Sequence, residues 1–328
     1  MAHEIEIING TARMMYAGET PWHGLGQKVD SEVTSAAAIR LAGLDWVCEK
    51  QPIYLSGTAM VDDIPVLGKQ IPGRQAVVRT EDKAIMGVVS DQYQIIQNSE
   101  CFDFMDEVVG SGQAVYHTAG SLFGGRIVFV TLKLPGQAKV GDDLIDKYIL
   151  MHTSHDGTFS LSVRWTPVRV VCANTAEFAF QNCSNVLNIR HASNYAQKVA
   201  EARKVLQLTE HYYSVMEKEF NKLLDAVITE EEMVKFTEEL FPVEEGKKVT
   251  TVTANKRMLV QKLAIVGTGN AAIVGTRWAA YNAVTEYADH YITPRSRNEE
   301  FKNDARMYSL CFGSGYDLKK RALQLLSV

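Results

Sequence analysis

The stretch from His152 to Phe180 concentrates the side chains with the most chemistry in this sequence. It reads HTSHDGTFSLSVRWTPVRVVCANTAEFAF and contains two histidines, an aspartate, two arginines, a tryptophan and a cysteine. Histidine and aspartate serve acid–base catalysis or metal binding, and arginine binds phosphate through paired N–H donors. The segment is therefore an active site, a nucleic-acid surface, or a hairpin that leads into a helix.

Asp156-Gly157 is typical of a two-residue hairpin turn. This turn predicts that His152 pairs with Leu161 and Tyr148 with Trp165, so that one face of the hairpin is almost wholly apolar and buried. The predicted buried face consists of Tyr148, Leu150, His152, Phe159, Leu161, Val163 and Trp165. The predicted opposite face consists of Ile149, Met151, Thr153, Ser160, Ser162 and Arg164.

This register argues against a catalytic or metal role for the histidines. It places His152 in the core, where a hydrogen-bonded structural histidine is the common case, and His155 in a solvated turn. No third ligand lies nearby in the sequence, so we predict no metal and no catalytic residue here. Should the protein be an enzyme, the candidates are His23, His152, His155 and Asp156.

Thr166-Pro167 has the form of a helix start, with threonine as N-cap and proline in the first turn. The N–H groups of such a turn, with Arg164 before it and Arg169 inside it, would hold a phosphate. The alternative is that both arginines pair with surface carboxylates.

Composition restricts the class of protein. The 328 residues are 46% hydrophobic and 22% charged with a net charge of −5, as in ordinary soluble domains. The first 112 residues are acidic and residues 247–328 are basic, which predicts a basic face or a charge that disperses in the fold. No apolar run approaches 18 residues and no export signal is visible, so we expect a cytoplasmic protein without a membrane span.

The five cysteines are scattered without a Cys-x-x-Cys pair, which predicts reduced thiols and neither a zinc site nor a disulfide framework. Gly267-Thr-Gly269-Asn-Ala-Ala formally matches a dinucleotide-binding loop. Only about forty residues follow its helix and they have helical patterns, whereas that fold needs further parallel strands. A glycine joint between two helices is the simpler interpretation, and we predict no cofactor.

Periodicity predicts an α+β fold, with an antiparallel sheet, a central hairpin and packed helices in residues 1–185, and a mostly helical region in residues 186–328. The two parts could share one core. The first part contains a predicted helix over Thr34–Leu41, a strand pair around Glu81-Asp82, a capped helix from Asn98 or Ser99, and an apolar central strand over Arg126–Leu134. The second contains an apolar heptad repeat over Val199–Val227, which predicts packing along another helix, and a capping box formed by Thr229 and Glu232.

Several segments together resemble a family found in phages and plasmids and named domain of unknown function 932. They include ETPWHGLGQKV, SDQYQIIQN, TAGSLFGGRIVF, SHDGTFSLSVRWTPVRVVCANT and GTRWAAYNAVTEYADH, and the resemblance runs from about residue 1 to 326. It implies a bacteriophage or plasmid protein made in the cytoplasm of a bacterial host. It implies no activity, since the family name records none.

The order of helix, antiparallel sheet with hairpin, and helix also resembles the architecture of single-strand annealing recombinases. This likeness implies a homo-oligomer that binds a DNA backbone along a basic groove without a nucleotide cofactor. Our leading hypothesis is therefore a single-stranded DNA binding or annealing protein of recombination or replication. The predicted phosphate contacts are Lys147, Arg164, Arg169, Arg190, Lys256, Arg257 and Arg277. The alternatives are a factor that binds a host or phage protein through the helices at 199–227 and 230–240, and an enzyme.

Overall fold

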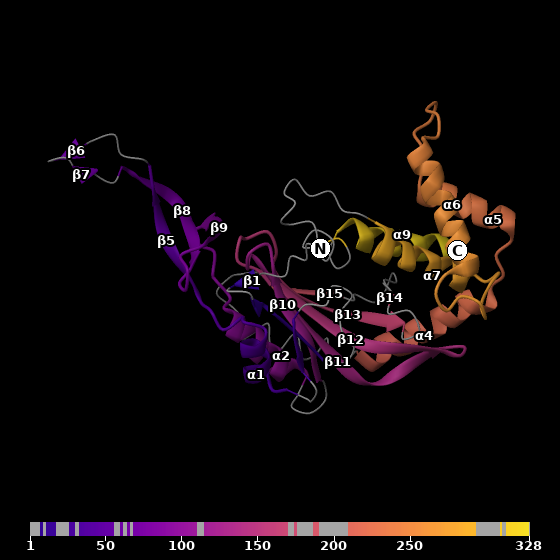
Figure 1. Cartoon of the computed structure of the whole chain (residues 1–328), viewed down its shortest axis with the longest axis horizontal. Coiled ribbons are helices and arrows are strands. Elements are labelled where there is room, and N and C mark those ends of the chain that lie inside the picture. Colours follow the sequence, from indigo (N-terminus) through magenta and orange to yellow (C-terminus); the bar gives the residue numbers. More distant parts are fainter. Residues whose placement is uncertain are drawn as a thin grey trace.

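A large antiparallel sheet occupies the middle of the computed structural model, with a three-stranded sheet at one end and a group of helices at the other (Figure 1). The structure describes residues 7–8, 11–17, 26–29, 33–55, 60–61, 64–65, 68–109, 115–169, 174–175, 186–189, 209–292, 309 and 313–327. The predicted fold class, a mixed α+β fold with a helical C-terminal part, is confirmed.

The large sheet has the strand order β14-β13-β12-β11-β10-β3-β4, and β15 also pairs with β13. Its neighbouring strands are antiparallel except for β3 and β4, which are parallel. The strands are β3 (Met14–Ala17), β4 (Gln27–Val29), β10 (Val115–Leu122), β11 (Ile127–Val140), β12 (Asp143–Ser154), β13 (Leu161–Arg169), β14 (Asn174–Thr175) and β15 (Val186–Ile189).

Strands β11 and β12 form the longest hairpin of this sheet. They are joined by Gly141-Asp142, and Gly141 has a φ of 59°, which the twist of a two-residue hairpin turn requires. The pairing shifts register between Lys133 and Gln137, so the outer half of the hairpin bends away from the rest of the sheet.

The three-stranded sheet has the order β5-β8-β9 and contains the strand pair that the sequence predicted around Glu81-Asp82. Its strands are β5 (Cys48–Tyr54), β8 (Gln70–Arg79) and β9 (Ile85–Ser90), and two small pairs are β1 (Ile7–Ile8) with β2 (Thr11–Ala12) and β6 (Met60–Val61) with β7 (Ile64–Pro65). The outer strand β9 meets the loop after β12, because a Cβ at Gly87 would lie 2.6 Å from the Cα of Asp156.

Two helices, α1 (Ser35–Leu41) and α2 (Asn98–Val109), pack together beside the first strands. Thr34 is the N-cap of α1 and accepts a hydrogen bond from the backbone of Ala37, as the predicted helix requires. The helix predicted from Asn98 is also confirmed, but the side chain of Asn98 bonds elsewhere: its Nδ2 donates to the carbonyl of Leu44, and its Oδ1 lies 2.9 Å from Nε2 of His155.

The helical end contains α4 (Thr209–Asp225), α5 (Glu230–Leu240), α6 (Thr251–Val266), α7 (Arg277–Glu286), the π-helix η1 (Tyr287–Tyr291) and α9 (Ser314–Leu326). The predicted capping box is present: Thr229 accepts from the backbone of Glu232, whose carboxylate accepts from the backbone of Thr229. Gly267 is the C-cap of α6, and the next helix begins at Arg277, so the Gly-x-Gly motif joins two helices as expected.

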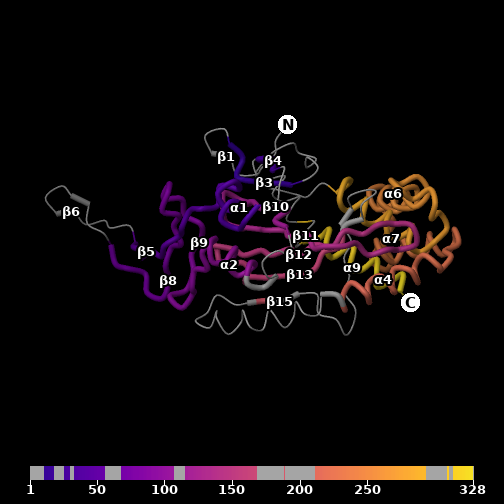
Figure 2. Tube along the Cα trace, turned by 90° about the horizontal axis from the view of Figure 1, so that it is seen from below, coloured from indigo at the N-terminus to yellow at the C-terminus, as the bar shows by residue number. Residues whose placement is uncertain are grey.

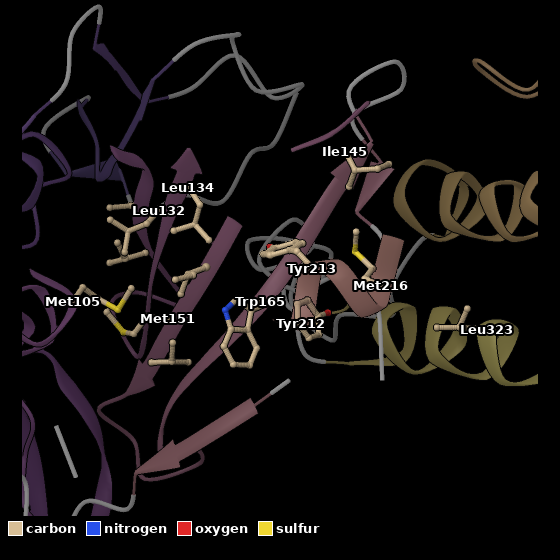
Figure 3. Close-up of a cluster of buried hydrophobic side chains, with 14 of the residues drawn as sticks. Met105, Leu132, Leu134, Ile145, Met151, Trp165, Tyr212, Tyr213, Met216 and Leu323 are labelled. Carbon is tan, nitrogen blue, oxygen red and sulfur yellow. The ribbon is translucent and has the colours of Figure 1, made fainter. Parts of the chain in front are cut away.

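One continuous hydrophobic core runs from Met15 in β3 to Leu326 in α9 and includes residues of both predicted parts of the chain. Figure 3 shows its centre, where Trp165 of β13 stacks on Tyr212 of α4 with ring centroids 5.0 Å apart. The predicted seam residues Tyr213, Met216, Phe220 and Leu223 of α4 are buried in it. The division near residue 185 stays a prediction.

Three local predictions are wrong. The pairing of β12 with β13 differs by one residue: His152 faces Ser162, and Ile149 faces Trp165. The segment from Thr166 to Arg169 continues strand β13 instead of starting a helix, and the chain forms β14 at Asn174. The helix α4 ends at Asp225, and Val227, predicted in its seam, is 71% exposed.

Pro167 is compatible with a strand because of its place in the sheet. It lies between the residues of β13 that pair with β15 and those that pair with β14. A proline is tolerated in a strand where its missing N–H would face away from the neighbouring strand. Among the helices that the structure describes, none has the length and apolar character needed to cross a membrane.

Candidate functional site

The observed register gives the central strands one polar and one apolar face. We call the side with Lys133 of β11, Asp146, Tyr148 and His152 of β12, and Arg164 of β13 the polar face. These residues share a side because directly paired residues, and alternate residues along a strand, point the same way.

The opposite side, the apolar face, is packed against α4. It carries Ile149, Met151, Val163 and Trp165, all of which belong to the main core. Tyr213 of α4 lies against this sheet: its hydroxyl donates to the carbonyl of Tyr148 at 2.8 Å and accepts from the N–H of Tyr148 at 2.9 Å. The second view, in Figure 2, shows α4 beside the ends of the strands at the helical end of the molecule.

A charged cluster lies on the polar face where β11 and β12 begin to bend away. The ammonium of Lys133 is 2.7 Å from Oδ2 of Asp146, and Nε2 of Gln137 donates to Oδ1 of the same carboxylate at 2.8 Å. The side chain of Lys133 is 41% exposed and that of Asp146 is 13% exposed. The ammonium also lies 5.9 Å from the ring centre of Tyr148. Lys133 therefore reaches solvent while a carboxylate holds it in place.

His117 of β10 borders this cluster. Its Nε2 is 3.4 Å from the hydroxyl of Tyr148, its ring meets that ring edge-on at 5.0 Å, and its Nδ1 is 3.0 Å from Oγ1 of Thr118. Burial and then the nearby charge of Lys133 lower the pKa of His117 to about 4. His117 is thus neutral at pH 7 and supplies hydrogen bonding instead of positive charge.

His152 and Arg164 lie deeper on the polar face. His152 is buried, as predicted, and meets Phe159 edge-on at 5.6 Å. Burial and then the charge of Arg164 lower the pKa of His152 to about 3. Arg164 is only 5% exposed, and its guanidinium lies 4.7 Å from the ring centre of Tyr316 at the start of α9. Arg164 thus packs on a ring at the protein interior instead of projecting from a surface.

The prediction of a solvated His155 is wrong. His155 is fully buried, its Nε2 is 2.9 Å from Oδ1 of Asn98, and its ring lies 5.1 Å from that of Trp46. Asp156 accepts from the backbone N–H of Thr158 in a local turn. The two histidines of the hairpin therefore have different neighbours and form no common catalytic set, while His23 lies outside the described residues.

The predicted phosphate contacts do not form one groove in the described part of the chain. Lys147 is 9% exposed and lies 5.4 Å from the ring centre of Tyr213, on the side of β12 opposite to Arg164. Nothing is described of the side chain of Arg169, although its backbone ends β13, and Arg190 lies outside the described residues.

The remaining predicted contacts lie on the C-terminal helices. Arg257 donates to the carbonyl of Phe241 at 2.8 Å and lies 3.3 Å from the carboxylate of Glu238. Arg277 donates to the carbonyl of Leu326 at 2.9 Å, so both arginines stabilise helix ends, whereas Lys256 is exposed on α6.

Alternating polar residues in β11 indicate the polar face in the sequence itself, although the sequence prediction treated this strand as apolar. Arg126–Leu134 was predicted to be apolar on both sides, yet Thr131 and Lys133 alternate with the buried Leu132 and Leu134. Gln137 and Lys139 continue this row on the exposed outer half of β11. The predicted central strand is confirmed, since β11 lies between β10 and β12 and both of its faces are buried from Ile127 to Val130, while the polar row begins only at Thr131 and Lys133.

Comparison with known proteins identifies one family. The family described as domain of unknown function (DUF932) matches residues 85–310. No curated protein and no solved structure matches the chain. Within the ranges that the structure describes, no three histidine, cysteine, aspartate or glutamate side chains are grouped so that they could hold a metal ion.

Proposed function

The chain belongs to the DUF932 family, whose description names no activity, and we propose that it binds single-stranded nucleic acid through the polar face of the large sheet. In this proposal it is a phage- or plasmid-encoded protein that holds or anneals single strands, most concretely DNA, during recombination or replication in the cytoplasm of a bacterial host. The resemblance to annealing recombinases supports the same class of function.

The observation that carries the proposal is the row of Lys133, Gln137 and Lys139 along β11. Lys133 is partly exposed, and Gln137 and Lys139 are exposed. A strand that presents two amines and an amide along one side suits an extended phosphate backbone, which each group can contact in turn. Such contacts are independent of base sequence and weaken as salt rises.

The partners of Lys133 set the strength of this contact. Asp146 neutralises part of its charge, and a phosphate would compete with that carboxylate for the same ammonium. His117 and His152 are neutral at pH 7 because of their lowered pKa values. The net positive charge on the described row therefore rests mainly on Lys139, and we expect modest affinity for each contact with strong dependence on salt.

Contacts to the backbone alone leave the edges of the bases accessible. A strand held in this way can still pair with a complementary strand, which is the requirement for annealing. Arg164 and His152 are buried and would not touch phosphate.

Fluorescence anisotropy of a labelled single-stranded oligonucleotide, measured over a salt series, tests the proposal. The double variant Lys133→Glu, Lys139→Glu should bind at least about tenfold more weakly at low salt, with a shallower salt dependence, because both phosphate contacts become repulsive. The matched control Lys235→Glu, Lys247→Glu reverses two exposed lysines on and just after α5 and should stay within about twofold of the native chain.

The proposal also requires that the native chain bind the single-stranded oligonucleotide. No binding even at low salt would overturn the proposal, and so would an equal loss of affinity in the two double variants. Circular dichroism of both variants establishes that they are folded, which we expect because all four lysines reach solvent.

Binding of a host or phage protein is a second candidate function, favoured by the acidic outer side of α5. Glu230, Glu231, Glu238 and Glu239 are all exposed there. The other surface predicted for this role, the seam of α4, is buried in the core. A defined protein bound at a one-to-one ratio, in a chain that does not bind oligonucleotides, would select this function over the first.

A further inference from the structure

Strands β5 and β8 extend past β9 as a two-stranded ribbon, which projects from the end of the molecule opposite the helical end (Figures 1 and 2). Strand β9 pairs with β8 only as far as Arg74, whereas β5 and β8 stay paired as far as Tyr54 and Gln70. Tyr54 is 40% exposed, and in the described part of the chain a Cβ at Gly73 would meet no non-neighbouring atom within 4 Å. We call residues 52–55 and 68–74 the ribbon.

The ribbon carries two cations and no carboxylate. Lys69 and Arg74 are exposed, and the ribbon contains no aspartate or glutamate. Along the sequence, the nearest carboxylates are those of Glu49, which lies 3.8 Å from the ammonium of Lys83, and of Asp62, which follows β6. The ribbon is therefore locally basic in a chain with a net charge of −5, and it suits a partner rich in negative charge.

The two cations point to the same side of the ribbon. Pro52 and Tyr54 of β5 point to one side, because alternate residues of a strand do so. Their partners in β8, Gln75 and Gln70, point to that side as well. Each cation is next in the sequence to one of these glutamines, so both cations point to the other side. Leu55, which is 57% exposed and follows Tyr54, shares the side of the cations.

A projecting two-stranded ribbon fits a groove of duplex DNA. The major groove is about 12 Å wide and admits such a ribbon between two rows of phosphates. Lys69 and Arg74 would donate to phosphate oxygens, and Leu55 would contact the methyl group of a thymine. A flat acidic protein surface offers no recess for a projecting ribbon, so a duplex is the partner that fits both its shape and its charge.

We propose that the ribbon binds duplex DNA, with the side of Lys69 and Arg74 in the major groove. Contacts to phosphate dominate, so binding is largely independent of base sequence and weakens as salt rises. The ribbon is separate from the polar face, which belongs to the large sheet, and the inference does not require that the polar face bind single strands. Together with that proposed function, it would let the chain hold the product of annealing as well as the strands.

Fluorescence anisotropy of a labelled DNA duplex, and of one of its strands alone, tests the inference over a salt series. Lys69→Glu, Arg74→Glu should bind the duplex at least about tenfold more weakly at low salt, with a shallower salt dependence, because two phosphate contacts become repulsive. Its affinity for the single strand should stay within about twofold of the native chain. The matched control Lys235→Glu, Lys247→Glu makes the same change of charge at the helical end and should bind the duplex as the native chain does.

Protection of amines from acetylation locates the contact in the native chain without any substitution. Mass spectrometry measures how fast each lysine is acetylated with and without the duplex. Lys69 should react several-fold more slowly when the duplex is bound, because phosphate covers its ammonium. Lys235, which is 77% exposed on α5, should react at the same rate in both samples.

Three results would overturn the inference. They are a native chain that does not bind the duplex at low salt, a Lys69→Glu, Arg74→Glu variant that binds it as tightly as the control, and a Lys69 that is not protected. An equal loss of affinity for duplex and single strand in that variant would remove the assignment to the duplex. The proposed function fails separately, if Lys133→Glu, Lys139→Glu leaves the affinity for the single strand unchanged. Circular dichroism establishes that each variant is folded.

Discussion

The two faces of the central strands carry different kinds of side chain, apolar on one and partly polar on the other, although the exposed fractions of these side chains are similar. On the apolar face, Met151 and Trp165 are 0% and 3% exposed and pack against core residues. On the polar face, His152 and Arg164 are 6% and 5% exposed. Burial of apolar groups stabilises a fold, whereas burial of polar and charged groups loses hydration that their partners only partly replace. The apolar face therefore contributes more to stability, whereas the polar face combines a small apolar cluster of Leu122, Ile127, Phe129 and Leu150 with buried polar and charged groups.

Replacement of a large side chain on the apolar face should have the largest effect. Trp165→Ala removes the ring stacked on Tyr212 and leaves a cavity, so we expect the free energy of unfolding to fall by about 3–5 kcal/mol. Leu150→Ala is the comparison on the polar face, where Leu150 belongs to a much smaller cluster with Leu122, Ile127 and Phe129. Urea denaturation should show the smaller loss for Leu150→Ala, and equal losses would remove the distinction between the faces.

Acid should destabilise the protein through the polar face. The folded pKa of His152 is about 3, below the value of about 6.5 in an unfolded chain, so between these values the unfolded state binds more protons. The stabilisation of the folded state that comes from neutral His152 is present above about pH 6.5 and is lost as the pH falls toward 3. His152 alone should lower the free energy of unfolding by about 2 kcal/mol between pH 7 and pH 5, and His117, with a pKa of about 4, adds to the same slope.

The comparison of His152→Gln with the native chain isolates that contribution. The variant should show a smaller decrease in the free energy of unfolding between pH 7 and pH 5, whatever its stability at pH 7. Denaturation curves at several pH values provide the measurement. A slope equal to that of the native chain would show that His152 titrates in the folded state as it does in the unfolded state.

The smallest effect is expected from the charge at Asp146. Asp146→Asn removes the carboxylate that holds Lys133, and should raise the affinity for single-stranded oligonucleotides by about two- to threefold at low salt. The free energy of unfolding should change by less than about 1 kcal/mol, because Lys133 is partly exposed and asparagine keeps an oxygen that can accept from Gln137. Asp225→Asn, an exposed position at the end of α4, is the control. A weaker affinity in Asp146→Asn would place the binding surface elsewhere.

Local signals in the sequence were sufficient for several elements. The capping box of Thr229 and Glu232 and the N-cap of Thr34 each depend on residues three positions apart, so no distant part of the chain is needed to form them. The joint at Gly267 was also predictable, because a glycine that follows an apolar helical pattern ends a helix in most contexts.

The hairpin shows where local reasoning fails. Asp156-Gly157 predicts a two-residue turn, but the loop between β12 and β13 is longer because side chains bond to its backbone. Asp156 accepts from the N–H of Thr158, and Oγ of Ser154 accepts from the N–H of Phe159. These bonds shift the register by one residue, and a shift by one exchanges the faces of β13 relative to β12.

The arrangement of the predicted binding residues also depends on the register. The sequence shows that Lys147 and Arg164 are basic, but their faces depend on the register, and the structure places them on opposite sides of the sheet. Thr166-Pro167 fits a helix start or a strand with equal ease, and only the neighbouring strands decide between them. Alternation within β11, in contrast, was visible in the sequence, and attention to Thr131 and Lys133 would have found the polar face.

The packing of α9 has a consequence for the order in which the chain can fold during synthesis. Lys319 of α9 is fully buried and paired with Asp289, and Leu323 and Leu326 join the core that also contains Met15. During synthesis Met15 emerges from the ribosome long before α9. Until α9 emerges, part of the apolar surface of the early strands and of α4 stays uncovered. The nascent chain is therefore most exposed to aggregation just before residues 314–326 emerge, and a chaperone that shields it would act in that interval.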